Sequence, residues 1–514
     1  MSSRECGDFL WGVATSAYQS EGGYNSAGMP HTNWAGAEKS GDVEPVGQAA
    51  EFWSRYQADF DTCHRLGLNA FRLSIEWSRI QPTMNDRVGQ APAYDYQALD
   101  YYSEILCQCR AQGLEPLVTL HHFVHPAWLG TDAWLDTSVV ADYIDYVRTV
   151  VLYINQTMIA KGHAPVRYFI TINEPNMLVL NTYLGHQFPS QARRNLRSSI
   201  RALDHLLTAH VLGYNAIHEI YRNCEWPPPL VTVNTYSSDL YWCDKLLLDL
   251  LSLREKKIEP MEINNFIRNR ARAFEEELAK AAIPIRKDFA AHIGTCIRNL
   301  SYRLGMKWFD IAHFPCFMSA LIDLPRNQLL DYIAIDYYDP FSAHSFRFPV
   351  WWDHEFKNKS FLSWIMNSIT SKWWDWTILP RGLYFFCRYY AEEFPGRPLI
   401  IAENGMALRR RRDNNHSNRR DNISRSEFLR LHIEEVIRIV RDEIPLIGYL
   451  HWSLFDNYEW GTYTPRFGLY NLNFQTGTDR LERDPNGDTP SETYALLILE
   501  ANQIMDNGVP IKGG

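Results

Sequence analysis

Residues 168–175 have the sequence YFITINEP, and residues 398–405 have the sequence PLIIAENG. Each is a short apolar run, typical of a buried strand, that ends in a glutamate followed by proline or glycine. The two glutamates are Glu174 and Glu403. Because the two contexts match although they are far apart in the chain, we expect both carboxylates to belong to one site at the mouth of one sheet.

Eight such runs occur along the chain. They are nearly continuous in apolar residues, as expected for parallel strands that are covered on both faces. Amphipathic helical patterns lie between them, and this alternation with eight strands predicts an α/β fold, the (β/α)₈ TIM barrel. The runs are 9–17, 69–75, 115–122, 168–175, 230–235, 331–338, 398–405 and 446–453. The helical patterns are 48–66, 96–112, 139–160, 196–221, 426–441 and a last helix that a capping box at Thr489 opens.

We expect one domain, residues 1–514, because neither a linker nor an internal repeat is visible. Two stretches are too long for simple connections: 237–330, and 341–380, which contains Trp351, Trp352, Trp373, Trp374 and Trp376. Both are predicted to be elaborated loops on the face where the strands end, where long loops shape access to a site.

The composition excludes several classes of protein. The net charge of −9 argues against non-specific binding to nucleic acid or anionic membranes, and no apolar run is long enough to span a membrane. The nine cysteines form no CxxC pair, which favours reduced thiols. The N-terminus lacks the apolar segment of a signal peptide, so we expect a cytoplasmic protein.

A basic segment follows the seventh run, with Arg409 to Arg412 and then Arg419 and Arg420. It could bind an anionic partner, but no aromatic side chains are interleaved as stacking platforms. We therefore predict a solvated surface loop.

Polar residues end every one of the eight runs. The active site of a (β/α)₈ barrel lies at the carboxyl ends of its strands, so these side chains should converge. A pair of carboxyl groups on either side of a scissile bond is what glycoside hydrolysis requires. The converging residues are Gln19, Glu21, Arg72, His121, His122, Asn173, Glu174, Asn234, Asp336, Tyr337, Tyr338, Glu403, Asn404 and Trp452.

Five motifs, in the same order, resemble those of glycoside hydrolase family 1, the β-glucosidase family. They are FLWGVATSAYQSEG at 9–22, FRLSIEWSRI at 71–80, TINEP at 171–175, AENG at 402–405 and WSLFDNYEW at 452–460. The resemblance implies a retaining glycosidase without cofactor or metal, acting on a small-molecule β-glycoside. Terminal β-D-glucosides are expected, with galactosides or fucosides as further substrates.

The resemblance also implies residue roles. Glu403 would be the nucleophile and Glu174 the general acid and base, with carboxyl groups about 5–5.5 Å apart. Arg72 would keep Glu403 ionised, because a nearby cation lowers a carboxylate pKa, and Tyr338 would donate a hydrogen bond to it. The residues implied to bind the sugar are Gln19, His122, Asn173 and Glu459, with Trp452 as the floor, Trp460 as a further donor and Trp376 as the leaving-group platform. His121 is expected to pack beside the site.

Departures from the family pattern, and residues that the chain retains, limit the substrates that we expect. Asp336 stands where the family usually has Asn, which leaves the pH optimum open. The acid/base is Glu174 rather than Gln, which argues against a thioglucosidase, and Glu459 argues against 6-phosphoglycosides. Two alternatives stay open: a transglycosylase with an alcohol or lipid acceptor, favoured by the tryptophans of 341–376, and a non-catalytic sugar-binding relative. The natural aglycone and the oligomeric state are open.

Overall fold

The computed structural model describes most of the chain. The predicted loop at 341–380 falls largely outside the described residues, together with Trp351, Trp352, Trp373 and Trp374. The described residues are 8–83, 89, 91–185, 187–322, 324–345, 376–410, 416–417, 419 and 421–507.

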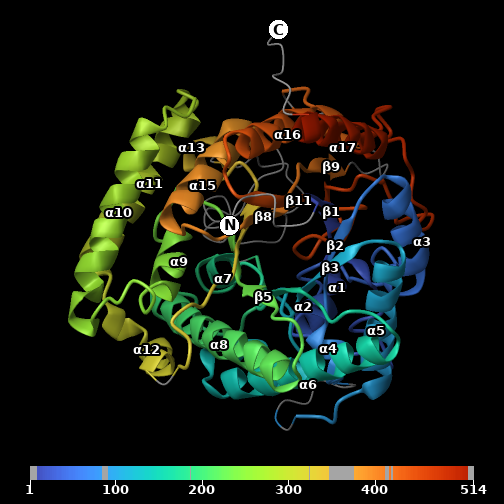
Figure 1. Cartoon of the computed structure of the whole chain (residues 1–514), viewed down its shortest axis with the longest axis horizontal. Coiled ribbons are helices and arrows are strands. Elements are labelled where there is room, and N and C mark those ends of the chain that lie inside the picture. Colours follow the sequence, from blue (N-terminus) through green and yellow to red (C-terminus); the bar gives the residue numbers. More distant parts are fainter. Residues whose placement is uncertain are drawn as a thin grey trace.

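Parallel strands form a barrel at the centre of the molecule (Figure 1). The strand order is β5-β4-β3-β2-β1-β11-β8-β7-β6. Only Val233 separates β5 (Leu230–Thr232) from β6 (Asn234–Tyr236), so the fifth apolar run pairs with β4 at one end and with β7 at the other and closes the barrel. The other strands are β1 (Leu10–Ala14), β2 (Ala70–Ser74), β3 (Glu115–Thr119), β4 (Tyr168–Ile170), β7 (Ile333–Tyr337), β8 (Leu399–Asn404) and β11 (Leu446–Trp452). The predicted (β/α)₈ barrel is confirmed.

Helices surround the barrel, and two buried layers result. One layer, which includes Ala14, Leu117 and Ile400, belongs to the barrel strands themselves; the larger one lies between strands and helices. The surrounding helices are α3 (Phe52–Arg65), α5 (Tyr96–Ala111), α6 (Ser138–Ala160), α8 (Leu196–Asn223), α15 (Pro380–Glu393), α16 (Arg425–Arg441) and α17 (Pro490–Asn507). The predicted helix 48–66 begins only at Phe52, because Ala49 and Glu51 have positive φ and cannot join a right-handed helix.

Short elements occupy the connections. They are α1 (Ala17–Ser20), α2 (Ala35–Ser40), α4 (Trp77–Ile80), α7 (Pro175–Val179), α13 (Ser342–Ser345), the 3₁₀ helices η2 (Ala127–Leu129), η3 (Ala133–Leu135), η5 (Pro260–Glu262) and η6 (Ile311–His313), and the π-helix η4 (Leu180–Leu184). A small antiparallel sheet contains β9 (Leu408–Arg410), β10 (His416–Ser417) and β12 (Pro465–Arg466).

The connection from β6 to β7 carries additional helices. They are α9 (Lys245–Leu251), α10 (Ile263–Lys280), α11 (Phe289–Trp308) and α12 (Pro315–Ile322). Figure 1 shows α10 and α11 side by side at the left edge, outside the ring of helices. The elaborated connection predicted at 237–330, whose sequence shows several helical patterns, is therefore mostly helical.

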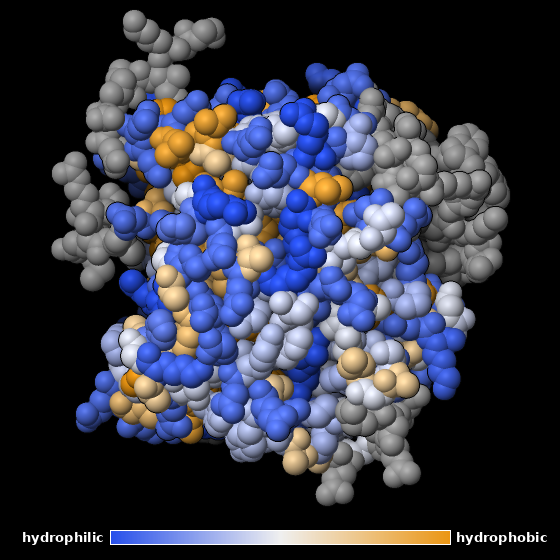
Figure 2. Space-filling view, turned by 90° about the vertical axis from the view of Figure 1, so that its right-hand side faces the viewer, coloured by the Kyte–Doolittle hydropathy of each residue, from blue (hydrophilic) through white to orange (hydrophobic). Residues whose placement is uncertain are grey.

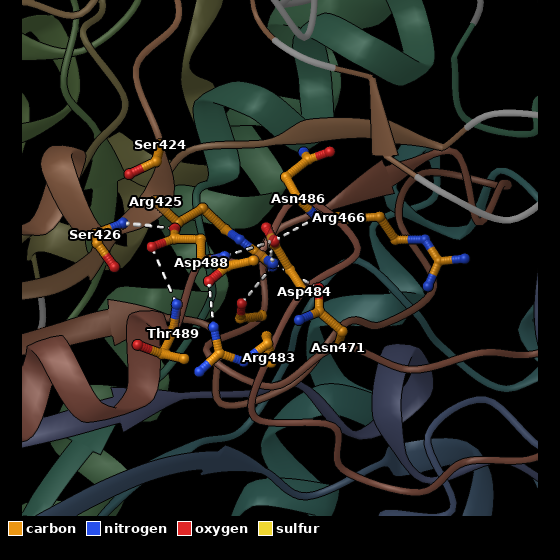
Figure 3. A network of polar contacts seen from close by, with 12 residues as sticks. Ser424, Arg425, Ser426, Arg466, Asn471, Arg483, Asp484, Asn486, Asp488 and Thr489 are labelled. Atoms are coloured by element: carbon orange, nitrogen blue, oxygen red, sulfur yellow. Dashed lines mark hydrogen bonds and ion pairs between the residues drawn. The ribbon is translucent and has the colours of Figure 1, made fainter.

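A buried polar network fixes the chain after β11 against the start of α16 (Figure 3). Arg425 donates to the carbonyl of Gly468 at 2.6 Å and to Asp484 Oδ2 at 3.2 Å. Asp484 Oδ1 accepts from the backbone amide of Asp488 at 2.9 Å, and Asp488 accepts from that of Ser426 at 3.0 Å. The network holds the segment that follows residues 453–460, which contribute to the barrel mouth.

Replacing Arg425 with Met should lower the free energy of unfolding by about 3–5 kcal/mol, because it leaves Asp484 buried without its cation. Urea-induced unfolding measures this. The matched control is Arg148→Met, which removes an exposed ion pair with Glu219 and should cost less than about 1 kcal/mol. Equal losses in both variants would contradict the role given to the network.

The face over α3 and α5 is mostly hydrophilic. Figure 2 shows charged and polar side chains across it, with hydrophobic side chains in small separate groups. Among the described residues, no helix combines the length and the apolar composition needed to cross a lipid bilayer.

Candidate active site

Glu403 lies at the end of β8, and two donors hold its carboxylate. Arg72 Nη1, from β2, is 2.6 Å from Glu403 Oε1, and the hydroxyl of Tyr338 is 2.7 Å from Oε2. Arg72 is wholly buried and also donates to Asn173 Oδ1 at 2.5 Å and Thr119 Oγ1 at 3.0 Å. These bonds fix the guanidinium and, through it, the orientation of Glu403.

The pKa of Glu403 is determined by two opposing effects. Burial raises the pKa above its ordinary value, whereas the charge of Arg72 and the hydrogen bonds from Tyr338 and Arg72 lower it. Burial outweighs the lowering effects. The predicted contact of Arg72 is present, and its charge lowers the pKa of Glu403 as expected, although by less than burial raises it.

Glu174 reaches the same place from the opposite side of the barrel. It precedes α7 at the N-cap position with φ of 36°, and Pro175 opens the helix. Its backbone amide donates to Asn234 Oδ1 at 3.2 Å. Carboxyl oxygens of Glu174, Asp336 and Glu403 all lie within 4.8 Å of one another. The two glutamates singled out in the sequence are thus brought together.

A cavity opens at this point. Of the predicted site residues, Arg72 and Asn173 are not part of its lining; Asn173 accepts hydrogen bonds from Arg72 and from Asn234, the latter at 2.8 Å. His121 packs edge-on against Trp134, as expected. The predicted residues that line the cavity are Gln19, His122, Glu174, Tyr338, Trp376, Glu403, Trp452, Glu459 and Trp460.

One wall of the cavity is a connected polar group. Glu459 accepts from Trp452 Nε1 at 2.8 Å and from Gln19 Nε2 at 3.0 Å, and His122 stacks on Trp452 with ring centroids 5.8 Å apart. Burial raises the pKa of Glu459 to about 8. Burial and then Arg72 lower the pKa of His122, so its imidazole is neutral and can both donate and accept hydrogen bonds.

Trp376 is held from two sides. Its Nε1 donates to Asp339 Oδ2 at 2.9 Å, and its carbonyl accepts from Arg419 Nη2 at 2.6 Å. Arg419 also pairs with Asp421 and is 4% exposed. The prediction of a solvated loop is wrong for this arginine, because a tertiary contact with Trp376 buries it.

Other cavity residues were not predicted. Met177 and Asn181 follow Glu174 by three and seven positions, so they lie on its face of the helical segment formed by α7 and η4. Helical spacing counted from Glu174 would have found both. The remaining unpredicted lining residues are Phe123, Gln187, Tyr236 and Phe467.

Within the residues that the structure describes, two groups of side chains approach closely enough to surround a cation. The first group is Glu174, Asp336 and Glu403, and there the guanidinium of Arg72 supplies a positive charge beside the carboxylates. In the second, Asp204, His205 and Cys316, the carboxylate caps the start of α12. We assign neither group to a metal.

A (β/α)₈ barrel with two glutamates and a polar, aromatic cavity at its carboxyl end has the architecture of a glycoside hydrolase. The chain belongs to glycosyl hydrolase family 1, whose model matches residues 2–238 and 298–488. The unmatched residues 239–297 contain α9, α10 and the start of α11.

Individual relatives are distant in sequence. The chain is 26% identical to Beta-glucosidase A of Thermotoga maritima, covering 91% of this chain and 93% of the relative. It is 25% identical to 6-phospho-beta-galactosidase 1 of Streptococcus pneumoniae, covering 91% and 94%. A solved family 1 β-glucosidase from Thermotoga maritima superposes with a TM-score of 0.65 at 20% identity, covering 96% and 98% of the two chains.

Proposed function

We propose that the protein is a retaining β-glycosidase that hydrolyses terminal β-D-glucosides. The observation that carries this proposal is the placement of Glu403 beside Glu174, with Glu403 held by Arg72 and Tyr338. A carboxylate held by two donors at a fixed angle is suited to attack, while the second carboxyl group serves the leaving oxygen.

In the first step, Glu403 would attack the anomeric carbon as the glycosidic bond breaks, and Glu174 would give its proton to the departing oxygen. In the second step, Glu174 would take a proton from water while the water oxygen displaces Glu403. Two inversions return the β configuration. Tyr338 and Arg72 would stabilise Glu403 when it leaves again as a carboxylate.

Glu459 is central to the choice of sugar. With Gln19 and Trp452 bound to its two oxygens, it offers acceptors in the wall of the cavity. His122, Asn173 and Trp460 would complete the sugar contacts, and Trp376 would carry the leaving group. A carboxyl group supplies no positive charge to bind a sugar phosphate, so we propose unphosphorylated glucosides, with galactosides or fucosides as slower substrates.

Proton NMR during hydrolysis of an aryl β-glucoside tests the proposal. The β-anomer of glucose should appear first and then mutarotate. Initial release of the α-anomer would contradict the retaining mechanism. Faster hydrolysis of a 6-phospho-β-glycoside than of the neutral glycoside would contradict the role of Glu459.

A buried side-chain amide in the cavity lining bears on the aglycone. Asn181 is 1% exposed, and among the described residues neither its side-chain Nδ2 nor its Oδ1 has a hydrogen-bond partner. A buried amide of this kind favours a ligand with hydroxyl groups. This supports leaving groups such as a second sugar over a purely apolar lipid.

Asn181→Leu should lower kcat/KM for cellobiose about tenfold, since one lost hydrogen bond to a hydroxyl costs about 1–1.5 kcal/mol. Hydrolysis of p-nitrophenyl β-glucoside should change less than about threefold. The reverse pattern, with the aryl glycoside affected more, would show that Asn181 does not select polar leaving groups.

Two alternatives remain testable beside hydrolysis. Adding an alcohol acceptor would reveal alkyl glucosides if the protein is a transglycosylase, and inactivity on a broad glycoside panel with sugar binding intact would indicate a non-catalytic relative. A single domain over 1–514 and a cytoplasmic location remain predictions from the sequence.

A further inference from the structure

Asp336 is a third carboxyl group in the catalytic cluster. It lies on β7, where the register pairs it with Tyr236 of β6 and Glu403 of β8. It is wholly buried, and Asn234 donates to its Oδ2. Within the described part of the chain its Oδ1 has no hydrogen-bond donor, and it lies 3.8 Å from Arg72 Nη1. One oxygen of Asp336 is thus left facing the catalytic residues.

Charged and titratable groups face Asp336 from several parts of the barrel. They are Arg72 from β2, Glu174 after β4, Glu403 on β8, and Tyr338 just beyond β7 itself. Arg72 is 2.6 Å from Glu403 but 3.8 Å from Asp336, so its positive charge mainly compensates Glu403. Three ionised carboxylates around one guanidinium would leave a large uncompensated negative charge in a buried site, which is costly.

The cluster therefore has to retain protons. Burial and then the negative charges of Glu403 and Glu174 raise the pKa of Asp336 well above its usual range, and Arg72 opposes this. A hydrogen bond with Glu174 adds to the increase. Carboxyl oxygens of Asp336 and Glu174 lie within 4.8 Å of each other, and two such acceptors become a favourable pair only when they share a proton.

We propose that Asp336 and Glu174 form a proton-sharing carboxyl pair, in which Asp336 positions the acid/base group and keeps it protonated at higher pH. The inference rests on the proposed role of Glu174. An Asn at position 336 could offer a hydrogen bond but could neither accept a proton nor carry a negative charge.

The proton balance over one turnover is closed. Glu174 gives the shared proton to the leaving oxygen in the step in which ester formation removes the negative charge of Glu403, so the number of negative charges in the cluster does not change. Water returns one proton to the pair through Glu174 as its oxygen bonds to the anomeric carbon and the bond to Glu403 breaks. Asp336 ends each cycle in the protonation state in which it began.

Asp336→Asn tests the pair. When the shared proton titrates, an ionised Asp336 favours the protonated form of Glu174, so the wild-type enzyme loses activity only at high pH. Without that charge Glu174 should ionise earlier. The basic limb of kcat/KM for an unactivated alkyl β-glucoside should therefore move to lower pH by about one unit. Hydrolysis of 2,4-dinitrophenyl β-glucoside should show no such shift, because this leaving group departs without protonation.

Asp59→Asn is the matched control. Asp59 is a buried carboxylate on α3 that pairs with Arg480, and its replacement should leave the basic limb in place. Asp336→Ser removes the same carboxyl group with a smaller side chain and should reproduce the shift, which keeps the test available if the Asn variant folds poorly.

An unchanged basic limb in a folded, active Asp336 variant would overturn the proposal. So would an equal shift with both leaving groups, since this would indicate a general effect on the site. Either result leaves the proposed function intact as long as the wild type hydrolyses β-glucosides with retention.

Discussion

Glu403→Gln should reduce kcat/KM for aryl β-glucosides by about 10⁴-fold or more, equivalent to about 5 kcal/mol of transition-state stabilisation. The amide keeps the size of the side chain and can still contact Tyr338, but it cannot form the glycosyl ester. Initial rates at saturating and limiting substrate measure the loss. Activity within tenfold of the wild type would contradict the assignment of the nucleophile.

Glu115→Gln is the matched control for this variant. Glu115 begins β3 at the opposite end of the barrel, where it pairs with Arg110 at 3.0 Å. Changes at that end of a (β/α)₈ barrel affect stability rather than catalysis, so activity should stay within about twofold of the wild type. The smaller variant Glu403→Gly allows a test of stereochemistry. Azide should restore its turnover by attacking the anomeric carbon directly, and this single displacement should give the α-glycosyl azide.

Glu174→Gln should have the second largest effect, and its size should depend on the leaving group. Without proton donation, kcat/KM for alkyl glucosides should fall about 10³–10⁴-fold. For 2,4-dinitrophenyl β-glucoside the first step should be nearly unaffected, so that the glycosyl-enzyme accumulates and a burst of dinitrophenol precedes slow turnover. The basic limb of the pH profile should disappear together with the carboxyl group.

Equal losses of the Glu174 variant on both substrates would argue against a role in protonation. Azide again distinguishes the two carboxylates, because Glu174→Gly should form the β-glycosyl azide from the glycosyl-enzyme. Opposite anomers from the two Gly variants would assign the two roles independently of rate.

The barrel and the position of the active site could be predicted because buried parallel strands give a strong pattern of apolar runs in the sequence. Runs such as 168–175 are apolar on both faces, and the polar residue that ends each run has to lie at the carboxyl edge. Gln19, His122 and Trp452 were placed by the same reasoning together with the family motifs. Their convergence on one cavity follows from the closure of the sheet.

Features that depend on tertiary contacts and on opposing electrostatic effects could not be predicted in this way. Arg419 belongs to a basic segment, and only its contact with the carbonyl of Trp376 buries it. The pKa of Glu403 depends on whether burial or Arg72 has the larger effect, which the sequence does not contain. Asp336 was recognised as a departure, but its free oxygen and its distance from Arg72 come from the packing of three strands.

The long helical connection between β6 and β7 has a consequence for folding. The cost of closing a flexible chain segment increases by only about 0.6 kcal/mol for each doubling of its length, so this excursion adds little to the equilibrium cost of the barrel. The excursion has a larger effect on the folding rate, because the β6–β7 pairing joins residues far apart in the sequence and such long-range pairings form slowly. Among the seams between strands that follow one another in the chain, the one between β6 and β7 is therefore where we expect pairing to form last and to open first.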